Sequence, residues 1–245
     1  MSLPYFLATL RPGLAVGEEV TLSGEEAHHA VVRRTRVGER VALTNGAGTV
    51  AECTVLAADR KALRAGVESV SSVPPESPRL VVVQAIPKGD RGELAVEMLT
   101  EVGVDVIVPW AASRSVAVWR GERAAKALTR WRSTAREAAK QARRAWFPSV
   151  EEPASLSRVV ELLRSSSVPV VLHEAASGPL ADLPVPGRGE IVIVVGPEGG
   201  IAEEELAAFA EAGAEPVRLG SSVLRTSTAG VAAAAALLAR TPRWR

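Results

Sequence analysis

The chain has 245 residues, of which 47% are hydrophobic and 23% charged, and its formal net charge is +1. This length and hydrophobic content allow a sizeable core in one large or two modest domains and argue against intrinsic disorder. One cysteine and three histidines are too few for a disulfide framework or a structural zinc site, so we expect a reducing cytoplasm and no bound metal.

The first residues carry no sign of export, because residues 1–6 lack a basic region followed by an apolar run. No run along the chain approaches membrane-spanning length, so we expect a cytoplasmic protein without a membrane partner. Further on, 40–44 and 49–56 are short Val-rich runs separated by the Gly-rich stretch 45–48, which is typical of a β-hairpin. The first part of the chain is therefore predicted to be a small β-rich domain.

The segment 69–78 is rich in serine and proline, which favours a linker over a central strand or a helix. We place the domain boundary there, with domains at 1–73 and 74–245. Beyond it, apolar runs alternate with helical periodicity, which predicts an α/β domain with a mainly parallel sheet. The predicted strands cover 80–86, 104–109, 168–172, 191–195 and 216–219. The predicted helices cover 92–102, 122–146, 203–212 and 226–239.

The small net charge hides a strong separation of charge along the chain. Residues 114–144 carry 10 basic groups against two carboxylates, whereas 145–220 carry 4 basic groups against 12 carboxylates. A basic ridge is usually only a solvated helix face, but a surplus this one-sided favours contact with nucleic acid. The ridge predicted on the helix at 122–146 has near four-residue spacing and consists of Arg132, Arg136, Lys140, and Arg143 or Arg144. The apolar stripe predicted elsewhere on the helix consists of Leu128, Trp131, Ala135, Ala138, Ala142 and Trp146.

Three predicted strand ends carry glycine or polar residues, at 172–174, 196–201 and 219–230. In open α/β sheets, ligands bind outside the carboxyl ends of the strands, and glycines let backbone amides approach them closely. The stretch 196–201 is neither a Walker loop nor a dinucleotide fingerprint. The residues alone predict a glycine-lined pocket beside a polar Arg/Ser/Thr turn, with an ordinary tight turn as the alternative for the glycines.

Taken together, these stretches resemble the cofactor loops of the RsmE-type 16S ribosomal RNA uracil N3-methyltransferases of the SPOUT superfamily. The loops that carry the resemblance are Leu172-His173-Glu174, Gly196-Pro197-Glu198-Gly199-Gly200, Leu219-Gly220 and Val223-Leu224-Arg225-Thr226. Further matches are Lys88-Gly89-Asp90-Arg91, Glu101-Val102-Gly103-Val104, Ser113-Arg114-Ser115, Glu137-Ala138-Ala139-Lys140-Gln141, and His29 with Arg34-Thr35-Arg36-Val37-Gly38. The resemblance covers nearly the whole chain, and the combined pattern is highly specific although each piece alone is weak.

This resemblance implies a SPOUT-type trefoil-knotted, parallel-sheet methyltransferase domain at 74–245 and a PUA-like β-barrel RNA-binding domain at 1–73. It implies S-adenosyl-L-methionine as the cofactor and N3 of a decoding-region uridine of 16S ribosomal RNA, in the small ribosomal subunit, as the target. It also implies a homodimer, for which the alanine-rich helix at 226–239 is our physical candidate contact.

The cofactor site that the resemblance implies is made by residues of the three loops. They are Leu172, His173, Glu174, Val195, Gly196, Pro197, Gly200, Ile201, Leu219, Gly220, Ser222, Val223, Leu224, Thr226 and Thr228. Arg225 is the candidate for stabilising a uracil oxyanion, because a guanidinium group is always charged and offers several donors. Much of the family has a glutamate where this chain has Ser227, and a serine hydroxyl is not a general base unaided. Glu198 is the remaining candidate base or ribose ligand, with a charge partner for a helix N-terminus as the alternative.

Basic residues of both domains are predicted to contact RNA phosphates, which set affinity and register. They are Arg33, Arg34, Arg36, Lys88, Arg91, Arg114, Arg136, Lys140, Arg143 and Arg144. Two alternatives stay open: a non-catalytic ribosome-assembly factor that keeps the fold and the basic surface, and a methyltransferase for transfer RNA or another ribosomal site.

Overall fold

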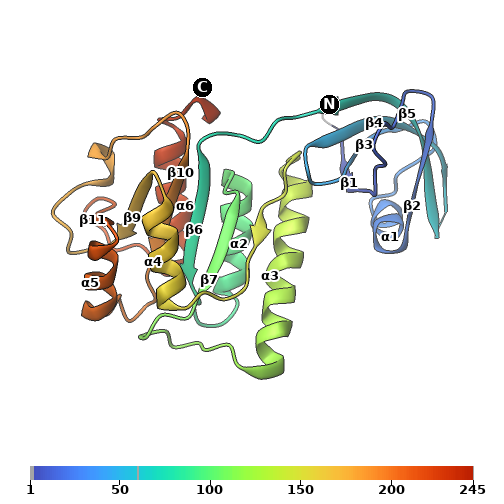
Figure 1. The fold of residues 1–245 in the computed structure, drawn as a ribbon. Helices are drawn as coiled ribbons and strands as arrows, with labels where there is room; N and C mark the ends of the chain where they lie inside the picture. Colours follow the sequence, from blue (N-terminus) through green and yellow to red (C-terminus); the bar gives the residue numbers. More distant parts are fainter. Residues whose placement is uncertain (1–2, 60, 245) are drawn as a thin grey trace. The chain divides into compact units, whose positions relative to one another are not determined.

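The computed structural model describes residues 3–59 and 61–244 of the chain. It divides into two compact units, the first formed by residues 1–75 and 139–147 and the second by residues 76–138 and 148–245 (Figure 1). Within the described ranges, no helix combines the length and the apolar character that crossing a membrane requires.

The first unit is built on a five-stranded sheet with the order β1-β3-β4-β5-β2. Its elements are β1 (Tyr5–Leu7), β2 (Glu19–Ser23), α1 (Gly24–Val32), β3 (Arg40–Thr44), β4 (Thr49–Ala58) and β5 (Ala62–Ser72). The predicted hairpin is confirmed, because β3 and β4 pair antiparallel across the turn at 45–48. Two register shifts between β4 and β5 curl the sheet around a core that includes Phe6, Leu43 and Cys53. Helix α1 was not predicted from the sequence.

The second unit contains a six-stranded sheet with the order β11-β9-β10-β6-β7-β8. Its strands are β6 (Arg79–Ala85), β7 (Val106–Trp110), β8 (Ser149–Val150), β9 (Val168–Leu172), β10 (Glu190–Val195) and β11 (Glu215–Val217). Every pairing in it is parallel, which confirms the predicted α/β class. The central strands are continuous apolar runs because helices cover both faces of the sheet.

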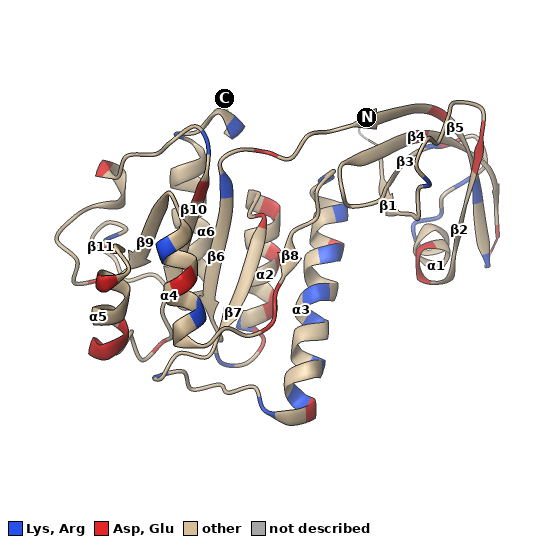
Figure 2. Ribbon diagram, viewed as in Figure 1, with Lys and Arg blue, Asp and Glu red and all other residues tan. Residues whose placement is uncertain are grey.

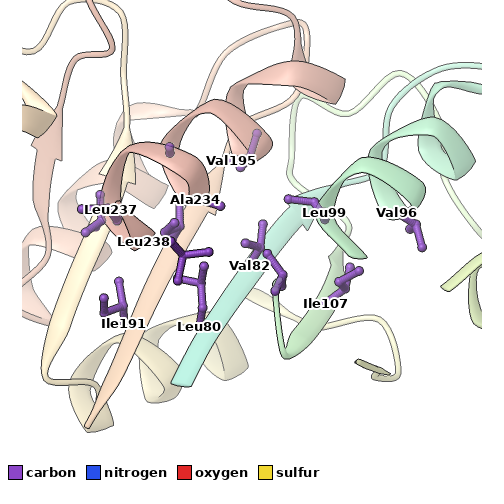
Figure 3. Packing of buried hydrophobic residues seen from close by; sticks show 14 of the residues in the cluster. Leu80, Val82, Val96, Leu99, Ile107, Ile191, Val195, Ala234, Leu237 and Leu238 are labelled. Atoms are coloured by element: carbon purple, nitrogen blue, oxygen red, sulfur yellow. The ribbon is translucent and has the colours of Figure 1, made fainter. Parts of the chain in front are cut away.

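Helices form a layer on each face of this sheet (Figure 1). They are α2 (Arg91–Val102), α3 (Gly121–Gln141), α4 (Leu156–Ser165), α5 (Glu203–Glu211) and α6 (Thr226–Leu238), with short 3₁₀ turns η1 (Leu180–Asp182) and η2 (Pro242–Trp244). Leu99 of α2 and Leu237 of α6 pack on one face of the sheet (Figure 3). Trp131 of α3 belongs to the same cluster. Leu163 of α4 and Phe209 of α5 pack on the other.

The alanine-rich helix α6 packs mainly inside its own unit. Ala233 and Ala234 are fully buried against the sheet and α2, and Ala236 is exposed. A Cβ at Gly230 would lie 3.2 Å from Val195 Cγ2 and 3.3 Å from Leu99 Cδ2. The small residues of α6 therefore serve its close approach to β10 and α2, so the face proposed for dimerisation is largely covered by the same chain.

Helix α3 ends at Gln141 instead of continuing to 146 as predicted. Arg143 adopts a left-handed backbone with φ of 56°, and the Arg144 amide donates to the Ala139 carbonyl at 2.9 Å, which closes the helix. Apolar periodicity continues past this point, which is why the sequence indicated a longer helix. Of the predicted stripe, Leu128, Trp131, Ala135 and Ala138 are buried. Trp146 lies beyond the helix, where its indole N–H donates to the Val73 carbonyl at 2.8 Å.

Arg243 anchors the segment after α6 within the second unit. Its side chain is 2% exposed. Its guanidinium donates to Asp105 Oδ2 at 2.7 Å, to Glu76 Oε2 at 2.6 Å and to the Gly103 carbonyl at 2.6 Å. Since buried charges are stable only when paired and hydrogen-bonded, this cluster holds the segment after α6 against the start of β6 and the loop before β7.

Candidate active site

Three neighbouring strands end at the same edge of the second unit's sheet. Leu172 ends β9, Val195 ends β10 and Val217 ends β11, and in the parallel register Leu172 is the partner of both Val195 and Val217. The loops that follow these strands enclose a pocket of about 440 Å³. This volume is within the range of small-molecule sites, which is roughly 300–1,000 Å³.

The pocket is lined by almost all of the residues predicted for the cofactor site. These are Leu172, His173, Glu174, Val195, Gly196, Pro197, Gly200, Ile201, Leu219, Gly220, Ser222, Val223, Leu224 and Thr226, together with Glu198 and Arg225. The fold thus brings together residues that are up to 54 positions apart in the sequence, from Leu172 to Thr226.

Thr228 is the predicted cofactor residue that the pocket lining does not include. Its hydroxyl donates to the Arg225 carbonyl at 3.1 Å, so its hydrogen bond is local to the start of α6. Ser227 is also turned away, since it is 2% exposed and does not line the pocket. Position 227 therefore faces the protein interior, and Ser227 contributes no side chain to the pocket lining.

Glycines let the loop after β10 pack tightly at the pocket. A Cβ at Gly196 would lie 2.7 Å from Ile201 Cγ1, and one at Gly199 would lie 2.9 Å from the Arg114 carbonyl oxygen. Gly200 has φ of +74°, and its amide donates to the Pro197 carbonyl at 2.9 Å to close the turn. Larger side chains at Gly196 or Gly199 would push the loop or its neighbour at 113–115 out of place.

Two polar residues that were candidates for chemistry have local partners. His173 Nδ1 accepts from the Ala175 amide at 3.2 Å, and the His173 amide donates to the Val217 carbonyl at 3.0 Å, so this residue shapes the turn after β9. Glu198 is exposed, and its Oε1 accepts from the Lys88 amide at 3.3 Å. The Glu198 carboxylate therefore joins the loop after β6 to the loop after β10 while remaining open to solvent.

The buried Glu205 carboxylate holds two segments together beside the loop after β10. Its Oε1 accepts from the Ser113 amide at 2.8 Å, and its Oε2 accepts from the Ala202 amide at 3.0 Å. It thus caps α5 and holds the segment that carries Arg114 beside Gly199. The sequence analysis did not single out Glu205, although a glutamate in the first turn after a glycine loop is a signal for such a cap.

Charged side chains of both signs line the pocket: Arg91, Arg218 and Arg225 with Glu174 and Glu198. In the described part of the chain, none of the five takes part in an ion pair. Arg225 precedes the first turn of α6 and Arg91 is the first residue of α2, so both cations lie where the helix dipole also favours an anion. The pocket therefore suits a ligand that carries charges of both signs beside an apolar body.

Arg91 is the residue whose place differs most from expectation. We predicted it as an RNA-phosphate contact, and the structure places it in the lining of the pocket. Val217, Arg218, Ser221 and Ala229 also line the pocket and were not predicted. A signal for Arg91 was present, because it follows the end of β6, the strand next to β10, in the sheet.

Lys140 does not lie on a solvent-facing ridge as predicted. It is 6% exposed, and its Nζ lies 2.6 Å from Glu26 Oε1 and 3.2 Å from His29 Nδ1. Glu26 Oε2 in turn accepts from the Leu7 amide at 3.1 Å. Lys140 is therefore a buried ion-pair partner that ties together the first unit, and we withdraw it as an RNA contact.

The other predicted RNA-contacting residues are partly or fully exposed. In the first unit, Arg33, Arg34 and Arg36 are exposed in the turn after α1, and Arg143 and Arg144 are exposed or half-buried after α3. In the second unit, Lys88 and Arg114 are exposed, whereas Arg136 is half-buried with its Nε 3.7 Å from Glu137 Oε1.

Lys and Arg residues occur along the whole of helix α3 (Figure 2). The exposed ones are Arg123, Lys126, Arg130 and Arg132, which lie before the half-buried Arg136 and the buried Lys140. Arg123 and Lys126 are exposed and, with Arg120 just before the helix, form no ion pair in the described ranges. In contrast, Arg130 pairs with Glu93 at 3.4 Å and Arg132 with Glu152 at 3.0 Å. The unpaired positive charge of this helix thus lies closer to its start than the sequence analysis predicted.

Two family models match the chain, the RNA methyltransferase domain over residues 75–238 and the RNA methyltransferase PUA domain over residues 22–68. The ribosomal RNA small subunit methyltransferase E of Mycobacterium bovis is 46% identical over 93% of this chain and 89% of its own length. The protein of the same name from Bacillus subtilis is 28% identical over 95% of this chain and 94% of its own length.

Solved structures are similar over nearly the whole chain. A methyltransferase of Legionella pneumophila in complex with SAM has a TM-score of 0.87 at 29% identity and covers 98% of this chain and 99% of its own. Ribosomal RNA small subunit methyltransferase E of Neisseria gonorrhoeae, bound to S-adenosyl methionine, has a TM-score of 0.86 at 30% identity and covers 98% of both chains.

Proposed function

The chain belongs to the family of ribosomal RNA small subunit methyltransferase E, and from this membership we propose that it methylates N3 of uridine 1498 of 16S ribosomal RNA. It is an S-adenosylmethionine-dependent 16S ribosomal RNA methyltransferase. Its fold is the predicted one, a parallel-sheet methyltransferase domain with a PUA-like first domain. We propose that the three pocket loops form the knot of the methyltransferase domain.

The residues of the pocket fit the cofactor. Apolar side chains from Leu172, Val195 and Ile201 with backbone groups of the glycine loops suit the adenosyl group. The carboxylates of Glu174 and Glu198 suit positive charge, and Arg218 suits a carboxylate. When bound, the cofactor supplies an electrophilic methyl group. We propose that the backbone of Leu172, Gly196, Gly200, Leu219, Gly220 and Leu224 holds its adenosyl part.

The proposed mechanism rests on the position of Arg225 in the pocket. Methyl transfer to N3 requires that N3 lose its proton, and the negative charge then spreads onto the uracil oxygens. The Arg225 guanidinium lines the pocket without an ion-pair partner in the described residues and lies at the positive end of α6. It can therefore donate to a uracil oxygen and stabilise the anion, which is the kind of electrostatic contribution that dominates many enzyme mechanisms.

Glu198 remains our candidate for the base or for a ribose ligand. Its carboxylate is exposed at the pocket rim, and the Lys88 amide donates to one oxygen, which leaves the other oxygen available. A carboxylate with one oxygen so held can accept a proton or a ribose hydroxyl with the other.

RNA contacts are proposed on each unit separately. Arg33, Arg34 and Arg36 with Arg143 and Arg144 supply positive charge on the first unit, which we propose binds RNA over residues 1–73. On the second unit, Lys88 and Arg114 lie on loops beside the pocket loops, and Arg136 follows on α3. The target base would leave its stack to enter the pocket, as in other enzymes that act on a base. Arg91, inside the pocket lining, suits the phosphate of the target nucleotide itself.

Two further proposals concern the oligomeric state and the cellular location of the protein. We propose a homodimer with the pocket near its interface, in which α6 contributes only the part not covered by its own unit. Sedimentation equilibrium of the purified protein tests this, because a monomer at every accessible concentration contradicts it. The substrate, ribosomal RNA, supports a cytoplasmic location.

The decisive experiment measures transfer of a labelled methyl group to small ribosomal subunits and to naked 16S ribosomal RNA, followed by mapping of the modified position. We expect one methyl group at N3 of uridine 1498. Label in transfer RNA or at another ribosomal position would replace this proposal by the second alternative. Cofactor binding by calorimetry without any transfer would leave a non-catalytic assembly factor.

A further inference from the structure

Gln84 is a polar residue in a row of apolar ones. Strand β6 turns Leu80, Val82 and Gln84 toward the layer formed by α2 and α6, and the first two belong to the core that these helices share (Figure 3). Gln84 is fully buried. It pairs in register with Val195, the last residue of β10, which lines the pocket. The side-chain amide of Gln84 thus lies on the apolar face of β6, at the end of the strand that is next to the pocket.

The Gln84 amide makes two specific hydrogen bonds. Nε2 donates to the Ala85 carbonyl at 3.1 Å and to the Thr226 carbonyl at 3.1 Å. Oε1 has no partner among the described residues. Burying an unpaired acceptor is unfavourable, and an apolar side chain would fill this position without that cost. The residue is therefore poorly explained by core packing and better explained by the bond that it makes to Thr226.

Thr226 is the first residue of α6, and the residue before it is Arg225. This helix start has no side-chain cap of its own. The bond from Gln84 joins it to β6, a strand 142 positions away in the sequence. Gly230, one turn further along α6, lets the helix approach so closely that a Cβ there would lie 3.4 Å from Gln84 Oε1. The position of the first turn of α6 is therefore fixed by a hydrogen bond from Gln84, a side chain of the sheet.

We propose that Gln84 is a positioning residue for methyl transfer, which holds the first turn of α6 so that Arg225 faces the reacting base. This inference rests on the role of Arg225 in the proposed function. Gln84 does not line the pocket, so it would act through Thr226 and the first turn of α6. Most of the cofactor site belongs to the loops after β9, β10 and β11, so losing the Gln84 bond should disturb catalysis more than cofactor binding.

The test separates catalysis from binding and from stability. Gln84→Met replaces the amide by an unbranched apolar side chain of similar size, and Gln84→Leu is the reserve if that variant does not fold. We expect kcat to fall by about 10- to 100-fold, since small misplacements of catalytic groups have effects of this order. The Kd for S-adenosylmethionine by calorimetry should change less than about threefold. The matched control is Val82→Ala in the same row, which should lower the Tm through a core cavity and leave kcat unchanged.

A rescue variant excludes a merely structural effect. In Gln84→Glu, the protonated carboxyl can donate to the Thr226 carbonyl, whereas the ionised form cannot. This variant should have a higher kcat than Gln84→Met at the acidic end of the assay range. Wild-type kcat in folded Gln84→Met, or Gln84→Glu no more active than Gln84→Met at every pH, would overturn the proposal. Failure of the proposed function is distinct, because the wild-type protein itself would then transfer no methyl group.

Discussion

At the scale of single residues, position in the fold decides which charged and polar groups are available for chemistry. Arg225 and Lys140 are both cations in predicted functional stretches, yet Arg225 lines the pocket and Lys140 is buried against Glu26. The sequence predicted the pocket residues well because they follow strand ends that share one sheet edge. It could not show that Lys140 has a carboxylate partner, because that partner lies 114 positions away.

Arg225→Ala should lower kcat by about 10²- to 10³-fold, which is the usual effect of removing one donor to a developing oxyanion. Arg225→Lys should recover only part of this loss, because an ammonium group lacks the planar set of donors. The Kd for S-adenosylmethionine should stay within a few-fold of the wild-type value in both variants. Single-turnover methyl transfer and calorimetry provide the two readouts, and an unchanged kcat in Arg225→Ala would remove Arg225 from the mechanism.

Cys53 makes the stability of the first unit depend on alkaline pH. Burial raises the pKa of the Cys53 thiol from 9.0 to about 11, and the nearby Glu68 carboxylate adds to this rise. The unfolded chain loses this proton at lower pH than the folded protein, so stability falls as the pH rises from 9 toward 11. Urea unfolding at several pH values should show a smaller decline over this window in Cys53→Ala. Equal slopes in the two proteins would contradict the assignment.

At the scale of elements, hydrophobic periodicity predicted most strands and helices of the second unit but misjudged where some of them end. Helix α3 stops at Gln141 because a non-glycine residue, Arg143, adopts a left-handed conformation, which no composition rule anticipates. Helices α1 and α4 were missed, although at 9 and 10 residues they are no shorter than the predicted α5. Which residues of these helices are buried depends on the sheets that the helices cover, and the local sequence does not show that packing.

The packing of α2 on α3 depends on Gly92. A Cβ at this position would lie 2.8 Å from two atoms of the Trp131 indole, which is too close for any real contact. Gly92→Ala should therefore destabilise the protein by about 1–3 kcal/mol despite the better helix propensity of alanine. Glu97→Ala, at an exposed position of the same helix, should stay within about 0.5 kcal/mol of the wild type. Chemical denaturation of both variants makes the comparison.

The unpaired cations at the start of α3 should contribute to RNA affinity. Reversing Arg123 and Lys126 to glutamate is expected to weaken binding to small subunits and to reduce the slope of log K against log salt by about 1 per lost phosphate contact. Arg158→Glu, on α4, changes the charge at a residue already paired with Glu161 and serves as the control. Cofactor affinity should not change. Unaltered RNA binding in the double variant would exclude this face from the RNA interface.

At the scale of the whole molecule, the order of the strands is the feature that the sequence did not yield. The carboxyl edge forms a site because β10 lies between β9 and β6, and β11 lies beside β9. Local periodicity identifies strands but carries no information on which strands become neighbours. The rule that ligands bind at the carboxyl ends of the strands grouped the three loops at one sheet edge, and the family resemblance supplied the cofactor and the roles of the residues.

Arg243 should be a strong determinant of the stability of the second unit. Arg243→Ala leaves the Asp105 carboxylate without its guanidinium partner, so we expect a loss of about 3–5 kcal/mol, as for other broken buried ion pairs. Arg158→Ala breaks an exposed pair and should cost less than about 1 kcal/mol. Thermal and chemical unfolding distinguish the two outcomes, and similar small losses in both would contradict the anchoring role.

The position of β10 in the sheet has a consequence for how the protein is made. Of the strands in this six-stranded sheet, β6 is synthesised first, but its neighbour β10 follows more than 100 residues later, and the arginine at the start of α6 comes after that. A nascent chain that ends before residue 219 would thus have an incomplete methyl-donor pocket. S-adenosylmethionine should therefore protect the full-length chain from proteolysis and leave such shortened chains unprotected. The ligand would thus stabilise only the full-length protein.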